Sequence, residues 1–199
     1  MITPTPKRGA RPTCLLLMGV SGAGKTTTGR RLAKALGWVF RDADDFHPPH
    51  NIAKMAAGEP LTDEDRWPWL DAIGAWIDSR RHHGGRAIVT CSALRRSYRE
   101  RLLTGRPDVR LVFLKGSKAL IADRLSRRNG HFMPASLLDS QFMTLEEPRR
   151  DEHAIVVDVS LPPSRVVATI VRYVEPRRAP LAPIAQSPRP VKRPERPHR

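Results

Sequence analysis

Short apolar runs alternate along most of this chain with stretches in which apolar residues recur every three or four positions. The short runs are typical of buried strands, and the periodic stretches are typical of amphipathic helices. The pattern predicts strands over residues 13–18, 38–41, 87–91, 109–114 and 154–158. It predicts helices over residues 25–36, 52–57, 65–81, 97–103, 118–128, 134–145 and 163–173. Strands that alternate with helices indicate the α/β class, with a parallel sheet wrapped by helices.

Glycine and proline mark the limits of two of these helices. Gly37 follows the helix 25–36 directly, where we expect it to act as the C-cap. In the helix 65–81, Leu70, Ile73 and Ile77 share one face, and Pro68 is tolerable only in the first turn.

The two ends of the chain lack any helical or strand period. Residues 175–199 alternate proline and arginine, and residues 1–12 look similar. Segments with so few apolar residues bury too little surface to offset their ordering entropy. We therefore expect two disordered basic tails around one domain over residues 13–174.

Over half of the net charge of +15 lies in these tails, which carry +3 and +5 and leave +7 on the domain. A basic domain of this size suits phosphates and an anionic substrate, and does not require nucleic acid. We expect no specific nucleic-acid partner, although RNA binding through the C-terminal tail stays open. No run reaches the length of a membrane span or resembles a signal peptide, which predicts a cytoplasmic protein without membrane contact.

The two cysteines lie in apolar runs. Cys14 opens one predicted strand and Cys91 closes another, so parallel neighbours place the thiols at opposite ends of the sheet. That separation is too large for a disulfide. We expect two buried free thiols and no metal cluster built from them.

Residues 19–26 match the phosphate-binding pattern GxxxxGK[ST], between a predicted strand and a predicted helix. Glycines let the backbone N–H groups turn towards an anion, and the helix start adds its positive end. In such loops the lysine, here Lys25, reaches the β and γ phosphates, and the hydroxyl of Thr26 ligates Mg²⁺. A flexible Gly/Ser turn is the plain alternative. The predicted ATP-binding residues are Gly19, Val20, Ser21, Gly22, Ala23, Gly24, Lys25, Thr26 and Thr27.

Acidic residues follow the second predicted strand, and the ligand crevice of an open parallel sheet lies beyond the carboxyl ends of its strands. By strand alternation, Asp42 and Asp44 share a face towards the phosphate loop, while Asp45 points away. Asp42 is the candidate for the Mg²⁺ hydration shell and Asp44 for the base that accepts a hydroxyl proton. No aspartate closes the third strand, so the metal role falls to Thr26 and Asp42. An acidic strand-to-loop turn is the alternative.

Basic residues near the same edge are candidates for holding an anionic substrate. Arg66 lies near a helix start, and Arg95 and Arg96 follow the third strand, where we expect both to project into the crevice. His47 is a candidate for binding a substrate hydroxyl, although a lone loop histidine is more often structural. Nearby tryptophans are candidates for a pocket wall or for the core.

Two further arginines, Arg124 and Arg128, are four positions apart and share one helix face, with Arg127 off that stripe. Residues 130–132 form a possible hinge after them. Arginines on a closing flap suit phosphoryl transfer, because the transferred group carries charge in its transition state and water must be kept out. A solvated basic face is the alternative.

Several segments together resemble the bacterial gluconokinases of the P-loop type, from about residue 14 to residue 174. They are residues 19–27, 42–48, 51–55, 58–70, 91–99, 113–116, 131–133 and 140–148. The resemblance implies ATP-dependent phosphorylation of D-gluconate to 6-phospho-D-gluconate, which feeds the pentose phosphate or Entner–Doudoroff pathway. It implies a P-loop kinase fold with a five-stranded parallel sheet, a lid and a substrate-binding helical segment, and a homodimer. Ala43 replaces a more usual glycine of the family.

On this reading the catalytic residues are Lys25, Asp44, Arg124 and Arg128, and Mg²⁺ is held by Thr26 and Asp42. Asp44, His47, Arg66 and Arg95 would bind the substrate. Two alternatives stay open: a kinase for another small hydroxy acid such as shikimate, and a nucleotide-dependent regulator or RNA binder that acts through the tails.

Overall fold

The structure, a computed structural model, describes residues 11–127 and 135–175 of the chain. Both predicted tails fall almost entirely outside these ranges, as do Arg128 and the predicted hinge at residues 130–132. The prediction that the tails are disordered is therefore not tested.

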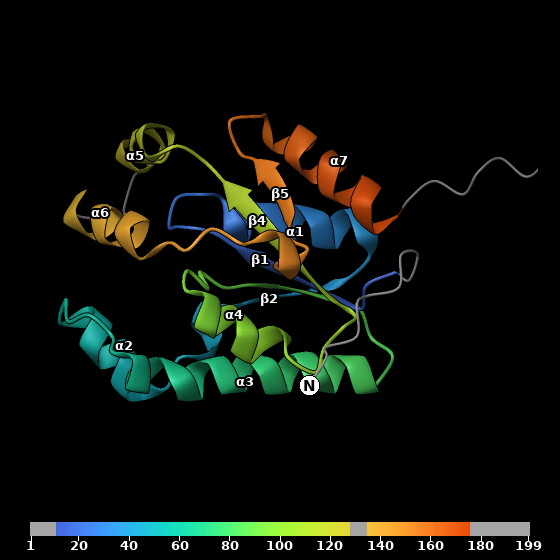
Figure 1. The fold of residues 1–199 in the computed structure, drawn as a ribbon, viewed down its shortest axis with the longest axis horizontal. Coiled ribbons are helices and arrows are strands. Elements are labelled where there is room, and N and C mark those ends of the chain that lie inside the picture. The colour runs from blue at the N-terminus through green and yellow to red at the C-terminus, as the bar shows by residue number, and fades with distance from the viewer. Residues whose placement is uncertain (1–10, 128–134, 176–199) are drawn as a thin grey trace, which may run out of the picture.

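A single five-stranded parallel sheet forms the centre of the molecule (Figure 1). Its strands are β1 (Cys14–Met18), β2 (Val39–Asp42), β3 (Ala87–Thr90), β4 (Val109–Lys115) and β5 (Ile155–Asp158). They are ordered β2-β3-β1-β4-β5, and each pair of neighbouring strands is parallel. The predicted α/β class and five-stranded parallel sheet are confirmed.

The α-helices are α1 (Lys25–Leu36), α2 (Pro49–Ala56), α3 (Asp63–His82), α4 (Arg96–Leu103), α5 (Lys118–Ser126), α6 (Ala135–Thr144) and α7 (Pro163–Val174). Helices cover both faces of the sheet, with α1 and α7 on one side and α3 and α4 on the other (Figure 1). Side chains of β1 alternate between the two cores, with Leu15 and Leu17 in one and Leu16 in the other. This explains the uninterrupted apolar run, because a strand covered on both faces has no polar side.

Helix α3 differs from its prediction, because it begins at Asp63 rather than at residue 65. Thr62 forms a capping box: its hydroxyl accepts the backbone N–H of Asp65, and the Asp65 carboxylate accepts the backbone N–H of Thr62. Pro68 therefore lies in the second turn, and the expectation of a first-turn proline is wrong. Gly37 is confirmed as the C-cap of α1, with a φ of +68°.

Cys14 and Cys91 are buried free cysteines, as predicted. Burial is the main cause that raises the pKa of each thiol to about 12, so neither is a reactive thiolate at neutral pH. In the described part of the chain, no helix has both the length and the apolar character that crossing a bilayer requires.

Candidate active site

The phosphate loop joins Met18, the last residue of β1, to Lys25, the first residue of α1, as its motif requires. Gly19, Gly22 and Gly24 have φ values of +146°, +83° and +90°, which L side chains rarely adopt. A Cβ atom at Gly22 would also lie 2.9 Å from Cγ of Leu125 on α5. The loop geometry therefore needs glycine for both backbone and packing reasons.

Lys25 folds back over this loop. Its Nζ donates hydrogen bonds to the carbonyl oxygens of Gly19 at 3.0 Å and Val20 at 3.2 Å. Desolvation lowers the pKa of Lys25, and the carboxylates of Asp44 and Asp42 oppose that shift. The ammonium thus lies between the loop that is predicted to hold phosphates and the acidic turn that is predicted to serve the acceptor.

The oxygen atoms predicted to serve Mg²⁺ lie together. Thr26 Oγ1 donates a hydrogen bond of 2.7 Å to Oδ2 of Asp42, at the end of β2. A hydroxyl and a carboxylate are hard oxygen donors of the kind Mg²⁺ accepts alongside water and phosphate oxygens. Among the described residues no group of three or more His, Cys, Asp or Glu side chains is placed to hold a metal. The Thr26 hydroxyl and the Asp42 carboxylate fit Mg²⁺ as two of its oxygen ligands.

Asp44 lies in a 3₁₀ turn, η1 (Ala43–Phe46), which begins directly after β2. Strand alternation is therefore the wrong reason for its orientation, although Asp44 does lie beside Asp42, to whose Oδ1 its backbone N–H donates at 3.4 Å. Desolvation and then the charge of Asp42 raise the pKa of Asp44. Asp45 is turned to Arg41, 3.8 Å away in an ion pair.

His47 follows this turn and stacks on Trp69 of α3, with ring centroids 4.4 Å apart and planes 7° apart. Trp69 is itself held, because its Nε1 donates a 2.7 Å hydrogen bond to the carbonyl oxygen of Ala43. Trp69 is thus a core residue that supports the site. Burial is the largest cause that lowers the pKa of His47.

Arg66 and Arg95 meet at Asp63, the first residue of α3. Arg95 Nη1 lies 2.7 Å from Oδ2 of Asp63, and Arg66 Nη1 lies 3.7 Å from Oδ1. The Tyr98 hydroxyl also donates to Asp63, and both guanidinium groups lie 5.8 Å from the Tyr98 ring centre. The structure therefore brings the two predicted substrate arginines together, and adds Asp63 and Tyr98, which the sequence analysis missed.

Arg96 does not join this group, contrary to our expectation. Its guanidinium forms ion pairs with Glu100 and Asp151, at 2.8 and 2.7 Å, and its backbone N–H donates to Glu146. As the first residue of α4, Arg96 is turned towards carboxylates on the outside of that helix.

The predicted flap arginines have mixed outcomes. Arg124 on α5 donates from Nη2 to the carbonyl oxygen of Val159, in the loop after β5. Arg127, the C-cap of α5, pairs with Asp123 of that helix, and Arg128 lies outside the described residues. The role of Arg124 and Arg128 in closing over the phosphoryl group stays a prediction.

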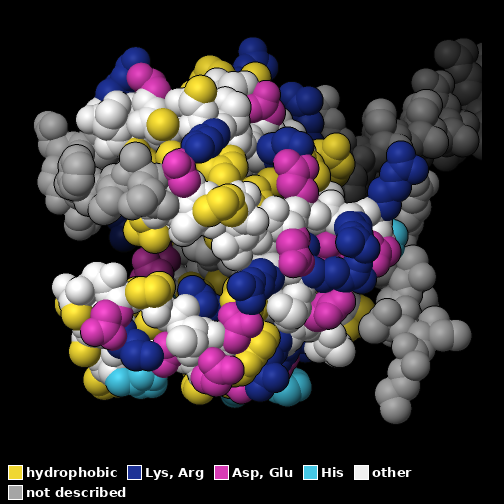
Figure 2. All heavy atoms as spheres, turned by 60° about the vertical axis from the view of Figure 1, so that its left-hand side comes forward, with side chains coloured by type: hydrophobic (Ala, Val, Ile, Leu, Met, Phe, Trp, Pro, Cys, Tyr) yellow, Lys and Arg dark blue, Asp and Glu magenta, His cyan; other side chains and the backbone are white. Residues whose placement is uncertain are grey.

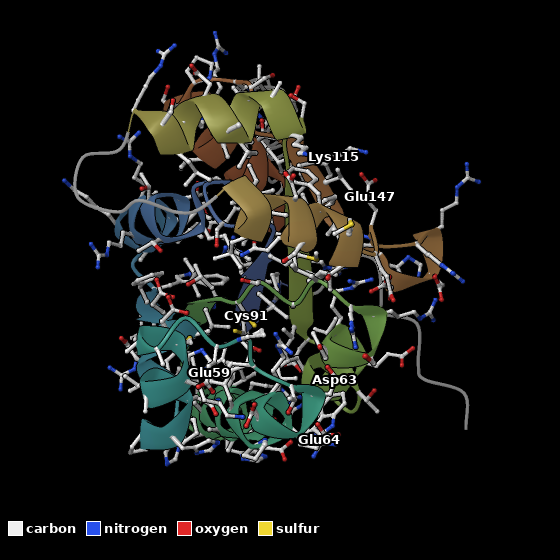
Figure 3. All side chains as sticks on the ribbon, turned by 90° about the vertical axis from the view of Figure 1, so that its left-hand side faces the viewer. Glu59, Asp63, Glu64, Cys91, Lys115 and Glu147 are labelled. Atoms are coloured by element: carbon white, nitrogen blue, oxygen red, sulfur yellow. The ribbon has the colours of Figure 1, made fainter. Side chains whose placement is uncertain are left out.

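A third residue that the sequence did not predict for the site is Gln141 of α6. Its Oε1 accepts the backbone N–H of Ser21 at 2.7 Å, and its Nε2 donates to Ser21 Oγ at 3.1 Å. Beside it, Val20, Phe113 and Phe142 help to line a pocket of about 170 Å³, which Lys115 and Glu147 also border. These two charges form a 2.7 Å ion pair (Figure 3).

A hollow separates an upper from a lower part of the molecule on this face (Figure 2). In Figure 3, Glu59, Asp63 and Glu64 lie on the lower part, Lys115 and Glu147 lie on the upper part, and Cys91 lies between them. Figure 2 shows the same face hollowed between these parts, with basic and acidic side chains interleaved around it.

Comparisons with known proteins agree with this geometry. The AAA domain family matches residues 15–148. The gluconokinase of Gluconobacter oxydans is 47% identical over 167 residues, which cover 84% of this chain and 94% of that protein. The thermoresistant gluconokinase of Escherichia coli is 41% identical over 80% of this chain and 92% of its own length. This chain belongs to the gluconokinase family.

Solved structures place this gluconokinase-family chain in the same fold. The crystal structure of a gluconokinase from Sinorhizobium meliloti 1021 superposes with a TM-score of 0.76, at 45% identity, over 83% of this chain and 93% of that one. A shikimate kinase from Bacteroides thetaiotaomicron matches with a TM-score of 0.59 at only 17% identity, which shows the shared fold alone. The predicted P-loop kinase fold is confirmed.

Proposed function

We propose that this chain transfers the γ-phosphoryl group of ATP to the 6-hydroxyl of D-gluconate, giving 6-phospho-D-gluconate and ADP. The observation that carries the proposal is the 2.7 Å contact between Thr26 and Asp42, because it joins the phosphate loop to the acidic turn that holds Asp44. The relatives named as gluconokinases match over four fifths of the chain or more, and thereby support gluconate as the acceptor.

The nucleotide half of the site binds and orients ATP. The N–H groups of the glycine-rich loop and the start of α1 face its phosphates, and Lys25 turns from the Gly19 and Val20 carbonyls to the β and γ phosphates. Thr26 and Asp42 would hold Mg²⁺, which supplies positive charge to the phosphate oxygens.

The acceptor half positions gluconate. Asp44 orients the 6-hydroxyl and accepts its proton, and its raised pKa brings the carboxylate closer to the basicity that a general base needs. Arg66 and Arg95 hold the gluconate carboxylate, which competes with Asp63 for the same guanidinium groups. His47 binds a hydroxyl of the sugar chain.

Arg124 and Arg128 complete the proposal by closing over the phosphoryl group as its charge develops. We also infer a homodimer, for which the family resemblance is the support. Light scattering of the purified chain tests the dimer independently of catalysis.

The direct test is ADP release with Mg-ATP and D-gluconate, run beside shikimate, glucose, AMP and no acceptor. Turnover with gluconate alone is the expected result. Turnover with shikimate instead would retain the kinase fold and overturn the acceptor assignment. Removal of residues 175–199 separates the remaining alternative, because an RNA-binding regulator would lose binding while a kinase would keep its turnover.

A further inference from the structure

Asn51 of α2 is a completely buried polar residue beside the acceptor half of the site, which includes His47. Its Nδ2 donates a 2.9 Å hydrogen bond to the backbone carbonyl oxygen of Asp65 and lies 3.3 Å from Nδ1 of His47. A carbonyl oxygen only accepts hydrogen bonds, so the amide nitrogen, and not Oδ1, must face Asp65. The orientation of the Asn51 amide is therefore determined by a partner other than the histidine.

The same nitrogen then determines which ring nitrogen of His47 carries a proton. Nδ2 of Asn51 has a second N–H, and a hydrogen bond from it requires a lone pair on His47 Nδ1. A neutral imidazole with its lone pair at Nδ1 has its proton at Nε2. Stacking on Trp69 fixes the plane of the ring, and Asn51 fixes its rotation within that plane.

We propose that Asn51 is a positioning residue that holds His47 as the neutral Nε2–H tautomer, so that His47 donates a hydrogen bond to a hydroxyl oxygen of the acceptor. This inference rests on the proposed function for its substrate, but the tautomer itself does not. Burial is the largest cause that acts on the pKa of His47, and it lowers that pKa. Two charged groups act on the ring from neighbouring elements: Asp44 raises the pKa and Arg66 lowers it. Together these causes lower the pKa of His47, which favours the neutral ring.

One further observation fits a positioning role for Asn51. Its Oδ1 is buried and has no hydrogen-bond partner among the described residues. Leaving such an acceptor unpaired is unfavourable, and an apolar residue of similar size would avoid that cost. The amide is therefore explained better by its two donated hydrogen bonds than by packing alone.

The decisive measurement is a long-range ¹H–¹⁵N correlation spectrum of the full chain at pH 7.5, without substrate. The chain has seven histidines, and the signals that disappear in His47→Gln identify this ring. We expect an unprotonated Nδ1 and a protonated Nε2. A protonated Nδ1, an equal mixture of tautomers or a doubly protonated ring would each overturn the proposal.

Asn51→Asp is the matched variant, because it replaces the amide donor with a carboxylate acceptor of the same shape. If it folds, we expect the proton to move to Nδ1; an unchanged spectrum would overturn the role of Asn51.

A second experiment leaves Asn51 unchanged and compares the activity of two variants of His47, His47→Gln and His47→Asn. The amide nitrogen of a glutamine at position 47 mimics Nε2, whereas that of an asparagine mimics Nδ1. His47→Asn should therefore lose about five- to tenfold more in kcat/KM for gluconate than His47→Gln, the equivalent of one neutral hydrogen bond.

Equal losses in these two variants would overturn donation from Nε2 to the acceptor. Absence of gluconate turnover in the unmodified chain, together with an Nε2–H signal, would overturn the proposed function and leave the tautomer intact. The two failures are therefore distinguishable.

Discussion

Gln141 and Ser21, which are 120 positions apart in the chain, are joined by two hydrogen bonds that use both ends of the glutamine amide. Ser21 belongs to the phosphate loop and Gln141 to α6, the helix that follows the predicted flap. The amide therefore links the position of α6 to the conformation of the loop.

Gln141→Ala should lower kcat/KM for ATP by up to roughly thirtyfold, because it removes two neutral hydrogen bonds worth about 1 kcal/mol each. Steady-state kinetics with ATP varied at saturating gluconate provides the measurement. Met143→Ala is the control on the same helix, since Met143 is 82% exposed. We expect this variant to have the same kcat/KM for ATP as the unmodified chain. Equal kinetics for Gln141→Ala and the unmodified chain would show that the link has no role in nucleotide binding.

Lys25 and Asp44 have different roles in the proposed reaction: Lys25 contacts the phosphates, and Asp44 accepts the proton of the 6-hydroxyl. Lys25→Ala should lower kcat by several hundredfold, roughly 3–4 kcal/mol, because its charge acts mainly on the transition state. Asp44→Asn should also lower kcat, since the asparagine accepts no proton, while the KM for ATP should change little. Both are measured at saturating gluconate, and normal turnover in either variant would remove that residue from its role.

The local features of this molecule were predictable from its sequence. The strands and helices follow from apolar periodicity, and the phosphate loop follows from residues that are adjacent in the chain. Boundaries were less accurate where a side chain decides them. With Thr62 as its N-cap, α3 begins at Asp63, two residues before the predicted start at residue 65. Strand β2 ends at Asp42 because a 3₁₀ turn begins at the next residue, Ala43.

The site residues that sequence analysis missed make contacts between distant segments. Tyr98 and Asp63 are 35 positions apart, and their role emerges only when α3 and α4 pack together. Arg96 and Arg95 are adjacent and chemically identical, yet only Arg95 lies against Asp63. Periodicity does not determine which of two neighbouring side chains turns inwards at a helix start.

Arg95 is predicted to serve gluconate binding rather than catalysis. Arg95→Ala should raise the KM for gluconate by about tenfold or more, because hydrogen bonds to charged groups are worth roughly 1.5–3 kcal/mol, and should leave the KM for ATP unchanged. Arg96→Ala is the matched control, since its ion pairs lie with Glu100 and Asp151. Similar KM values for gluconate in the two variants would contradict the assignment of Arg95.

A buried ion pair supports the segment that leads to Arg95. The Arg99 side chain is 1% exposed, bonds Glu152 through two nitrogens, and donates from Nη1 to the carbonyl oxygens of Ala93 and Leu94. Glu152→Gln should destabilise the fold by about 3 kcal/mol, because it leaves the arginine charge buried without its counter-ion. Asp151→Asn removes an exposed pair and should cost less than about 1 kcal/mol. Urea unfolding of both variants measures the difference, and equal midpoints would contradict it.

Asp65 makes the free energy of unfolding depend on pH. Hydrogen bonds from Lys54 and then from the Thr62 backbone lower the pKa of Asp65 to about 2, from an ordinary 3.8. A carboxylate whose pKa is lower in the folded state stabilises the fold above its unfolded pKa, and this contribution is lost as the pH falls towards 2. The stability gap between the unmodified chain and Asp65→Asn should therefore be constant from pH 7 to about 5 and narrow between about pH 4 and 2. Thr62→Ala, which removes the other half of the cap, should cost about 1 kcal/mol at pH 7. Urea midpoints across this range test both, and a gap for Asp65→Asn that stays constant down to pH 2 would show that Asp65 has an ordinary pKa in the fold.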